Sequence, residues 1–246
     1  MHLSNKLRYM YSEEFVTFVK NGIGKYFIGT GNPNSNILIV GKESAIDSND
    51  NLGMCWYNNN AIDWKKHIFN NTSEELEYFV NENNHLRKGW GKNTWSKYQK
   101  LNDYIFEKTP KSFYVDFLKN IFTTEINDSP DKNTVNANKS GLNERKRLFK
   151  KSAFIQNFPV VILACSNYIQ NNDNIREIDD IFNVTYFGDE KGKYWYNKGN
   201  WFFLHYTPDY KKLVIHTRQL SADVKNKMLE DMGRIVREHL IKIEKY

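Results

Sequence analysis

A carboxylate and a histidine, far apart in the chain, each follow a short aliphatic run. Glu43 comes after Ile37 to Val40 and the pair Gly41-Lys42, and His216 comes directly after residues 213–215. Such unbroken runs are typical of strands buried on both faces of a parallel sheet, and ligands bind where those strands end. A carboxylate can orient water or stabilise a cation, and a histidine can stabilise a negative charge on a leaving group. A solvated Lys42–Glu43 pair and a structural histidine are the alternatives.

The elements that must position these residues alternate between strands and helices. Strands are expected at 37–40, 120–124, 160–165, 184–187, 194–196, 201–206 and 213–215, and helices at 12–22, 72–82, 94–105, 142–157 and 224–240. A polar loop is expected from 47 to 60. This order predicts a three-layer α/β/α fold with a central, mostly parallel sheet, in a single domain over residues 1–246. The strand ends, which include Thr123 or Thr124 and Cys165 with Ser166, then converge on one edge with Glu43 and His216.

The composition indicates a soluble globular protein with an acidic partner. The chain has 246 residues, a net charge of +6 and an aromatic fraction of 15%. A basic balance favours nucleic acid, because cationic surfaces release counterions from phosphates. The surplus of rings either stacks on bases or sugars or fills the interior. Two cysteines exclude a disulfide framework, a four-cysteine zinc site and an iron–sulfur cluster.

Targeting segments are not evident in the sequence. Residues 1–10 are polar and lack the apolar stretch of a signal peptide, and no run approaches the length of a membrane span. We therefore expect a cytoplasmic, monomeric protein without a membrane contact. The basic loop 87–92 is either a helix connector or a phosphate contact, and the basic runs within 145–151 are expected to form a solvated helix face.

Two motifs at the ends of the predicted strands resemble the uracil-DNA glycosylase superfamily. Residues 41–46, Gly-Lys-Glu-Ser-Ala-Ile, stand where the best-known branch has Gly-Gln-Asp-Pro-Tyr-His, and residues 53–57, Gly-Met-Cys-Trp-Tyr, stand where it has Gly-Leu-(Ala/Cys)-Phe-Ser. Residues 216–221, His-Thr-Arg-Gln-Leu-Ser, match His-Pro-Ser-Pro-Leu-Ser before the final helix. The order of elements agrees over about residues 36–240, although only these end motifs match in detail.

The resemblance implies a role for each matching residue. Glu43 would orient water and stabilise the sugar cation, and His216 would stabilise negative charge on the departing base. Trp56 would stack on the extruded base, Leu220 would wedge into the duplex, and Ser221 would contact phosphate. The alternatives for the two apolar residues are that Trp56 is part of the core and that Leu220 packs under the last helix.

Departures from the family pattern affect the base pocket. Ser44 replaces a proline, and Ala45 replaces the tyrosine that bars the thymine methyl group, so the pocket is expected to accept another base. The base-reading asparagine has no clear counterpart; Thr124 is the alignment choice and Asn120 its competitor. Arg218, within the altered Pro-Ser portion, is expected to hold phosphate or to be an ordinary surface arginine.

The expected activity is hydrolysis of the N-glycosidic bond of a flipped, uracil or otherwise damaged base in single- or double-stranded DNA, as part of DNA repair. This chemistry leaves an electron-poor sugar and an electron-rich base, which one carboxylate and one histidine can stabilise without a metal or cofactor. Lys42 is expected to join Arg218 in binding DNA. The alternatives are a nucleic-acid-binding protein of this fold without hydrolysis and a protein that binds a free nucleobase or nucleotide.

Overall fold

Four buried parallel strands form the centre of the protein. The computed structural model describes residues 11–70, 75–221 and 223–246. The parallel strands lie in the order β5 (Phe122–Glu125), β2 (Ile37–Gly41), β6 (Val160–Leu163) and β10 (Leu213–Thr217). Their aliphatic residues are fully buried, as continuous apolar runs in the middle of a parallel sheet predict. All four strands were expected from the sequence.

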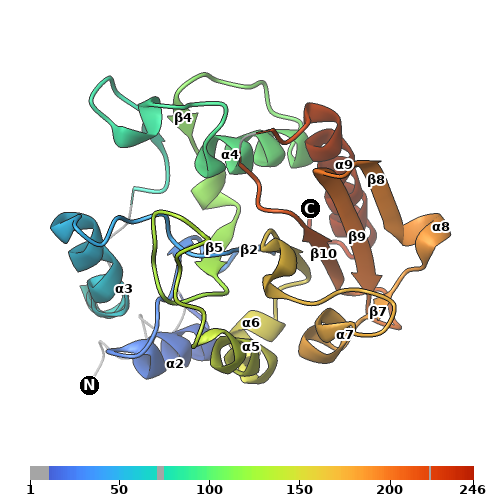
Figure 1. The fold of residues 1–246 in the computed structure, drawn as a ribbon, viewed down its shortest axis with the longest axis horizontal. Helices are drawn as coiled ribbons and strands as arrows, with labels where there is room; N and C mark the ends of the chain where they lie inside the picture. Colours follow the sequence, from blue (N-terminus) through green and yellow to red (C-terminus); the bar gives the residue numbers. More distant parts are fainter. Residues whose placement is uncertain (1–10, 71–74, 222) are drawn as a thin grey trace.

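Antiparallel strands extend this centre on both sides into a mixed sheet of 8 strands (Figure 1). β1 (Thr30–Gly31) pairs with β5, and β9 (Asn200–Tyr206) pairs with β10. β7 (Thr185–Tyr186) and β8 (Lys193–Asn197) both pair with β9. The expectation of a mostly parallel sheet therefore holds only for the centre. The strands expected at 194–196 and 201–206 form the β8–β9 hairpin, whose two-residue loop reverses the chain and so pairs these two strands antiparallel.

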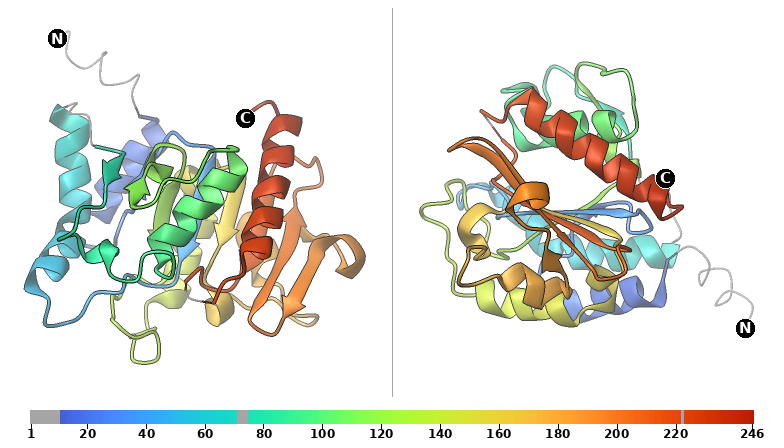
Figure 2. Two further views of the ribbon diagram at one scale, coloured as in Figure 1. Left: turned by 90° about the horizontal axis from the view of Figure 1, so that it is seen from above. Right: turned by 90° about the vertical axis from the view of Figure 1, so that its right-hand side faces the viewer.

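Helices cover both faces of the sheet (Figure 2). One face packs against α4 (Thr94–Ile105) and α9 (Asn226–Lys242), and the other packs against α2 (Glu13–Gly22), α5 (Leu142–Lys151), α6 (Ala153–Gln156) and α7 (Glu177–Phe182). Two separate hydrophobic clusters result, one on each face. The architecture is an α/β fold compatible with three layers. None of the described helices combines the length and apolar composition that a membrane span requires.

Residues 51–70 form a long helix, α3 (Asn51–Asn70), where a polar loop was expected for much of this stretch. Its buried face consists of Tyr57, Asn60, Ala61 and Trp64. The Asn60 side chain satisfies backbone groups of the approaching chain: its Oδ1 accepts from the Ile28 amide at 2.9 Å, and its Nδ2 donates to the Gly29 carbonyl at 3.0 Å. A polar residue therefore occupies the buried face, which hides the helical pattern of apolar residues.

Two other expected helices differ from the structure. The helix expected over 72–82 is wrong where the structure describes it, because β3 (Tyr78–Phe79) pairs there with β4 (Tyr114–Val115). Its supposed cap, Thr72, lies outside the described residues. The helix expected over 142–157 is broken at Ser152, whose hydroxyl accepts from the Ile155 amide and starts α6. The short elements are η1 (His85–Arg87), η2 (Phe117–Lys119), η3 (Ser166–Tyr168) and α8 (Asp189–Gly192).

Candidate active site at the carboxyl ends of the parallel strands

Glu43 lies just beyond the end of β2 and is held by two hydroxyl groups. The residue is 7% exposed. Its Oε1 accepts a hydrogen bond from Thr134 Oγ1 at 2.7 Å, and its Oε2 accepts one from the Tyr168 hydroxyl at 2.6 Å. Burial, and then the hydrogen bond to Glu43, raise the pKa of Tyr168, so this hydroxyl keeps its proton and donates. Glu43 is thus a buried carboxylate with a fixed orientation rather than a solvated one.

Thr134 and Tyr168 reach Glu43 from distant parts of the chain. Thr134 lies in the loop between β5 and α5, which docks on the end of β2 through the Asp131 amide and the Ser44 carbonyl, 3.1 Å apart. Tyr168 ends η3, directly after β6. Lys42 Nζ lies 5.0 Å from the centroid of the Tyr168 ring. Burial lowers the pKa of Lys42, and the neighbouring Glu43 acts in the opposite direction.

A second carboxyl group, Glu125, lies at the end of the adjacent strand. Glu125 is paired in register with Gly41, and a Cβ at Gly41 would lie 2.2 Å from Glu125 Oε2. This oxygen is buried and has no hydrogen-bond partner among the described residues. Burial, and then repulsion by Glu43, raise the pKa of Glu125 to about 8. The site therefore contains a neutral carboxylic acid next to Glu43 at neutral pH, which was not expected from the sequence.

Thr124, the expected base-reading residue, points toward the α5 layer. Its Oγ1 accepts from Arg145 Nη2 at 3.0 Å, and the same guanidinium donates to the carbonyls of Phe27 at 2.8 Å and Glu125 at 3.0 Å. Arg145 is 2% exposed, so the expectation of a fully solvated basic helix face is wrong at this residue. Because side chains alternate along a strand, Thr124 and Glu125 project from opposite faces of the sheet. Glu125 is nevertheless close enough to Glu43 for repulsion between the two carboxyl groups to contribute to its raised pKa.

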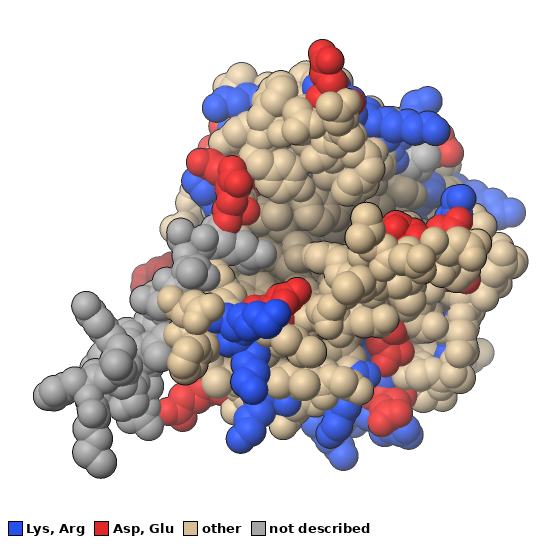
Figure 3. Space-filling model, turned by 90° about the vertical axis from the view of Figure 1, so that its left-hand side faces the viewer, with Lys and Arg blue, Asp and Glu red and all other residues tan. Residues whose placement is uncertain are grey.

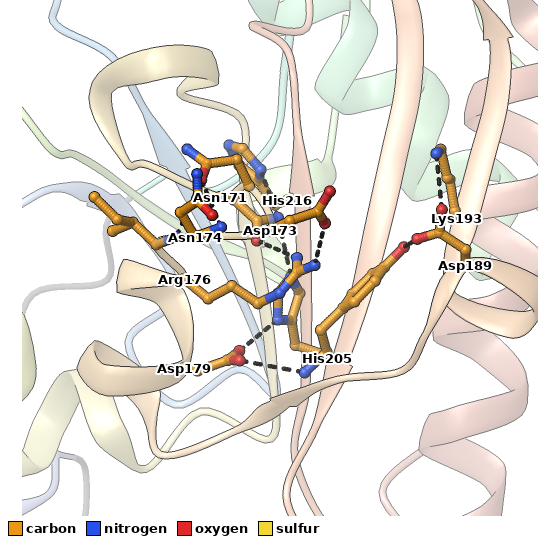
Figure 4. A network of polar contacts seen from close by, with 12 residues as sticks. Asn171, Asp173, Asn174, Arg176, Asp179, Asp189, Lys193, His205 and His216 are labelled. Carbon is orange, nitrogen blue, oxygen red and sulfur yellow. Dashed lines mark hydrogen bonds and ion pairs between the residues drawn. The ribbon is translucent and has the colours of Figure 1, made fainter.

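His216 lies at the end of β10 beside Asn171 (Figure 4), and both of its ring nitrogens are engaged. Nε2 lies 2.9 Å from the Ser166 carbonyl, and Nδ1 lies 3.2 Å from Asn171 Nδ2. A carbonyl can only accept, so Nε2 carries the proton and Nδ1 accepts from the amide. The residue is 3% exposed, and burial lowers its pKa to about 4. The ring is neutral at physiological pH.

The contacts of His216 continue into a chain of polar side chains that the sequence analysis did not predict. Asn171 Nδ2 also lies 3.2 Å from His205 Nε2, and His205 Nδ1 lies 2.6 Å from Asp179 Oδ1. Arg176 Nη1 donates to Asn171 Oδ1 at 3.1 Å. One proton arrangement satisfies all these contacts: Asn171 donates to both imidazoles, and His205 donates to the carboxylate. This network of hydrogen bonds fixes the tautomer of His216.

Glu43 and His216 approach the same turn from two sides. Tyr168, at one end of η3, binds Glu43, and Ser166, at its other end, accepts from His216. The turn follows β6, which lies between β2 and β10. The two predicted catalytic residues are thus linked through one short segment, as the convergence of parallel strand ends predicts. Cys165, which precedes this turn, is fully buried, and burial raises the pKa of its thiol to about 12.

The remaining predicted residues have more varied surroundings. Trp56 lies on α3, is 47% exposed, and has its ring centroid 5.6 Å from that of Phe27. Ser44 is half-buried and Ala45 is exposed in the loop after β2. Among the described residues, the side-chain hydrogen bonds of Glu43 and His216 go to other partners than these three.

The residues predicted to contact DNA are partly used within the protein. Leu220 is fully buried in the cluster under α4 and α9, so this conformation shows the packing alternative rather than a side chain ready to enter a duplex. Arg218 is half-buried, and its Nη1 donates to the Gly199 carbonyl at 2.7 Å. Ser221 is half-buried, and its amide donates to the Gln219 carbonyl.

Charge is dispersed on the face that Figure 3 draws. Figure 3 shows a hollowed face on which basic and acidic side chains alternate around the hollow. The net charge of +6 is therefore not gathered into a single basic surface on this face. Among the described residues, no group of three or more His, Cys, Asp or Glu is arranged to hold a metal ion.

Comparison with protein-family models, curated proteins and solved structures found no match for this chain. The superfamily resemblance therefore rests on the two strand-end motifs alone.

Proposed function

We propose that the protein hydrolyses the N-glycosidic bond of a base in DNA, with a fold like that of the uracil-DNA glycosylases. The observation that carries this proposal is the arrangement of Glu43 and His216 around one turn: a buried, oriented carboxylate and a buried, neutral imidazole. Glu43 stabilises the cation that forms on the sugar and orients the attacking water. His216 donates its Nε2–H to the base as negative charge develops there, giving up the Ser166 carbonyl.

Glu125 supplies the group that contacts the base in this proposal. A neutral carboxyl group presents one O–H donor and one acceptor, as a side-chain amide does. Its unpartnered, buried Oε2 is the type of atom that a ligand completes. Glu125 thereby takes the place that the sequence assigned to Thr124 or Asn120. Because Ala45 is small and exposed, the proposal includes bases other than uracil.

The test is a panel of single-stranded and duplex oligonucleotides that contain uracil, hypoxanthine, xanthine or mismatched thymine. Release of the base is read as strand cleavage after alkali. The wild type is expected to release at least one base, and Glu43→Gln and His216→Ala are each expected to lose most of this activity, by about 100-fold or more. Glu82→Gln, a change at an exposed glutamate, is the matched control. Intact oligonucleotides at high enzyme concentration would refute the proposal.

Binding of nucleic acid without hydrolysis is the second candidate, and one observation favours it. Both ring nitrogens of His216 contact the protein itself, and the side chain is almost completely buried. A purely structural histidine has these properties. Salt-dependent DNA binding without an abasic product, unchanged by Glu43→Gln, would support this candidate over the first.

A further inference from the structure

The hairpin formed by β8 and β9 is unusually aromatic. This segment, residues 193 to 206, contains lysines but no acidic residue. Seven of its fourteen residues are aromatic: Tyr194, Trp195, Tyr196, Trp201, Phe202, Phe203 and Tyr206. The chain as a whole is only 15% aromatic. This concentration accounts for part of the surplus of rings noted in the sequence.

The rings divide between the two faces of the hairpin because side chains alternate along a strand. One face belongs to the core: Tyr194 stacks on the buried Phe202 with ring centroids 4.4 Å apart. On the other face Trp195 is 56% exposed and is paired in register with the half-buried Trp201. Packing of the core therefore explains the first set of rings but not the second.

Four rings lie on this outward face, and we call them the aromatic platform: Tyr186, Trp195, Trp201 and Phe203. Strand register places Trp195 beside Trp201, and the other three rings are in contact. The ring centroids of Trp201 and Phe203 are 5.2 Å apart, and those of Tyr186 and Phe203 are 6.0 Å apart. The platform adjoins the candidate active site, because the His216 ring lies 5.2 Å from Trp201 and 6.4 Å from Phe203. The platform is thus continuous with the face that carries His216.

Basic side chains border the platform. Lys198, in the hairpin loop, is exposed, as is Lys193. The Arg176 guanidinium lies 4.1 Å from the centroid of the Tyr186 ring, on the same segment as Asn171 (Figure 4). Lys193 and Arg176 also pair with Asp189 and Asp173, which are exposed partners that phosphate groups can replace. Rings flanked by cations match the alternating bases and phosphates of a nucleic acid strand.

We propose that the aromatic platform binds single-stranded nucleic acid by stacking unpaired bases, and so leads the strand toward His216. Every base has a π-face, so the platform binds without reading a particular sequence. Bases in a duplex are already stacked on one another, and the platform therefore favours a single strand. The inference rests on the proposed function only for the direction in which the strand is led.

The test uses a fluorescein-labelled oligothymidylate without any damaged base and measures fluorescence anisotropy at low and at high salt. Trp195→Ala is expected to weaken binding by about 5- to 100-fold, and Trp195→Phe, which retains a ring, is expected to restore most of the affinity. Phe69→Ala removes a ring that is 77% exposed on α3 and is the matched control. An unlabelled duplex of the same length is expected to compete poorly.

Three outcomes would overturn the inference: no binding of oligothymidylate at low salt, equal affinity in Trp195→Ala and wild type, or dimerisation that Trp195→Ala abolishes in the absence of DNA binding. The last result would make the platform a contact between copies of the chain. Failure of the proposed function has a different signature, because base release is then absent while oligothymidylate binding still depends on Trp195. Base release that is unchanged in Trp195→Ala, with no oligothymidylate binding, would retain the function and refute the platform.

Discussion

Replacing Glu125 by Gln is expected to stabilise the protein at neutral pH and to have little effect in acid. The folded state raises the pKa of Glu125 from 4.5 to about 8, through burial first and Glu43 second. Between these two values the folded protein holds a proton that the unfolded chain has lost. The free energy of unfolding therefore falls as the pH rises from about 4.5 to about 8, because the folded state binds more protons than the unfolded state. Gln is similar in shape and carries no titrating proton. The free energy of unfolding of the variant is therefore not lowered in this way as the pH rises.

The size of the effect follows from the same pKa values. Each tenfold change in proton affinity corresponds to about 1.4 kcal/mol. At about pH 7, roughly 2.5 pH units above the pKa in the unfolded chain, the full difference would be about 3 kcal/mol. Relaxation around a buried carboxyl group reduces such differences, so we expect Glu125→Gln to be about 1–3 kcal/mol more stable than the wild type at this pH. The difference should vanish below about pH 4.

Urea unfolding followed by circular dichroism at a series of pH values between about 4 and 8 measures this difference directly. Glu82→Gln, which changes an exposed glutamate, is expected to unfold as the wild type does at each pH. If the free energies of unfolding of Glu125→Gln and wild type differ by the same amount at every pH, Glu125 is not held neutral by the fold. The assignment of Glu125 as a donor to the base would then fall as well.

Three further predictions concern the surroundings of this pair. Tyr168→Phe removes one hydrogen bond to the Glu43 carboxylate and is expected to lower the rate of base release by about 10-fold, because one charged hydrogen bond is worth about 1.5 kcal/mol or more. An unchanged rate would show that Tyr168 does not orient Glu43. Arg145→Met removes three hydrogen bonds, two of them buried, and is expected to lower the free energy of unfolding by about 3 kcal/mol in urea titrations. A loss below about 1 kcal/mol would contradict this role. Base release is expected to decline above about pH 8 as Glu125 ionises. It should show no inflection from His216 near neutrality, since the pKa of that ring is about 4. A pH profile of base release that rises through pH 8 would exclude a protonated Glu125.

The centre of the fold was predictable because its strands are defined by local sequence. The runs 37–40, 160–163 and 213–215 are aliphatic without interruption, and burial on both faces of a parallel sheet requires that pattern. The β8–β9 hairpin was predictable from the Lys198-Gly199 loop between aromatic strands. In α3, by contrast, a buried asparagine interrupts the apolar face, and its purpose, bonding to residues 28 and 29, cannot be seen from neighbours in the sequence.

The candidate site was predictable only where it depends on strand ends. Glu43 and His216 were found in this way, since each directly follows or ends a buried strand. Their partners are set by loops whose course the sequence does not reveal: Thr134 lies 91 residues from Glu43, and Asn171 lies 45 residues from His216. Glu125 was missed by one position, because the strand was expected to end at residue 124 and Thr124 was chosen by alignment with the family's base-reading asparagine. A signal was present in Gly41, whose lack of a side chain makes room for the Glu125 carboxyl group.

The charge states at the strand ends bear on which chemistry this edge supports. Two ionised glutamates side by side would repel each other, and burial of Glu125 resolves the conflict by keeping its proton. Burial acts on His216 in the same sense, so that its ring is uncharged. The candidate site then has one oriented carboxylate, Glu43, with neutral donors on Tyr168, Glu125 and His216 and the amino group of Lys42 near the Tyr168 ring. This distribution suits a reaction in which positive charge develops on one fragment and spread-out negative charge develops on the other, because the carboxylate stabilises the first and neutral hydrogen-bond donors stabilise the second. Cleavage of an N-glycosidic bond has that form.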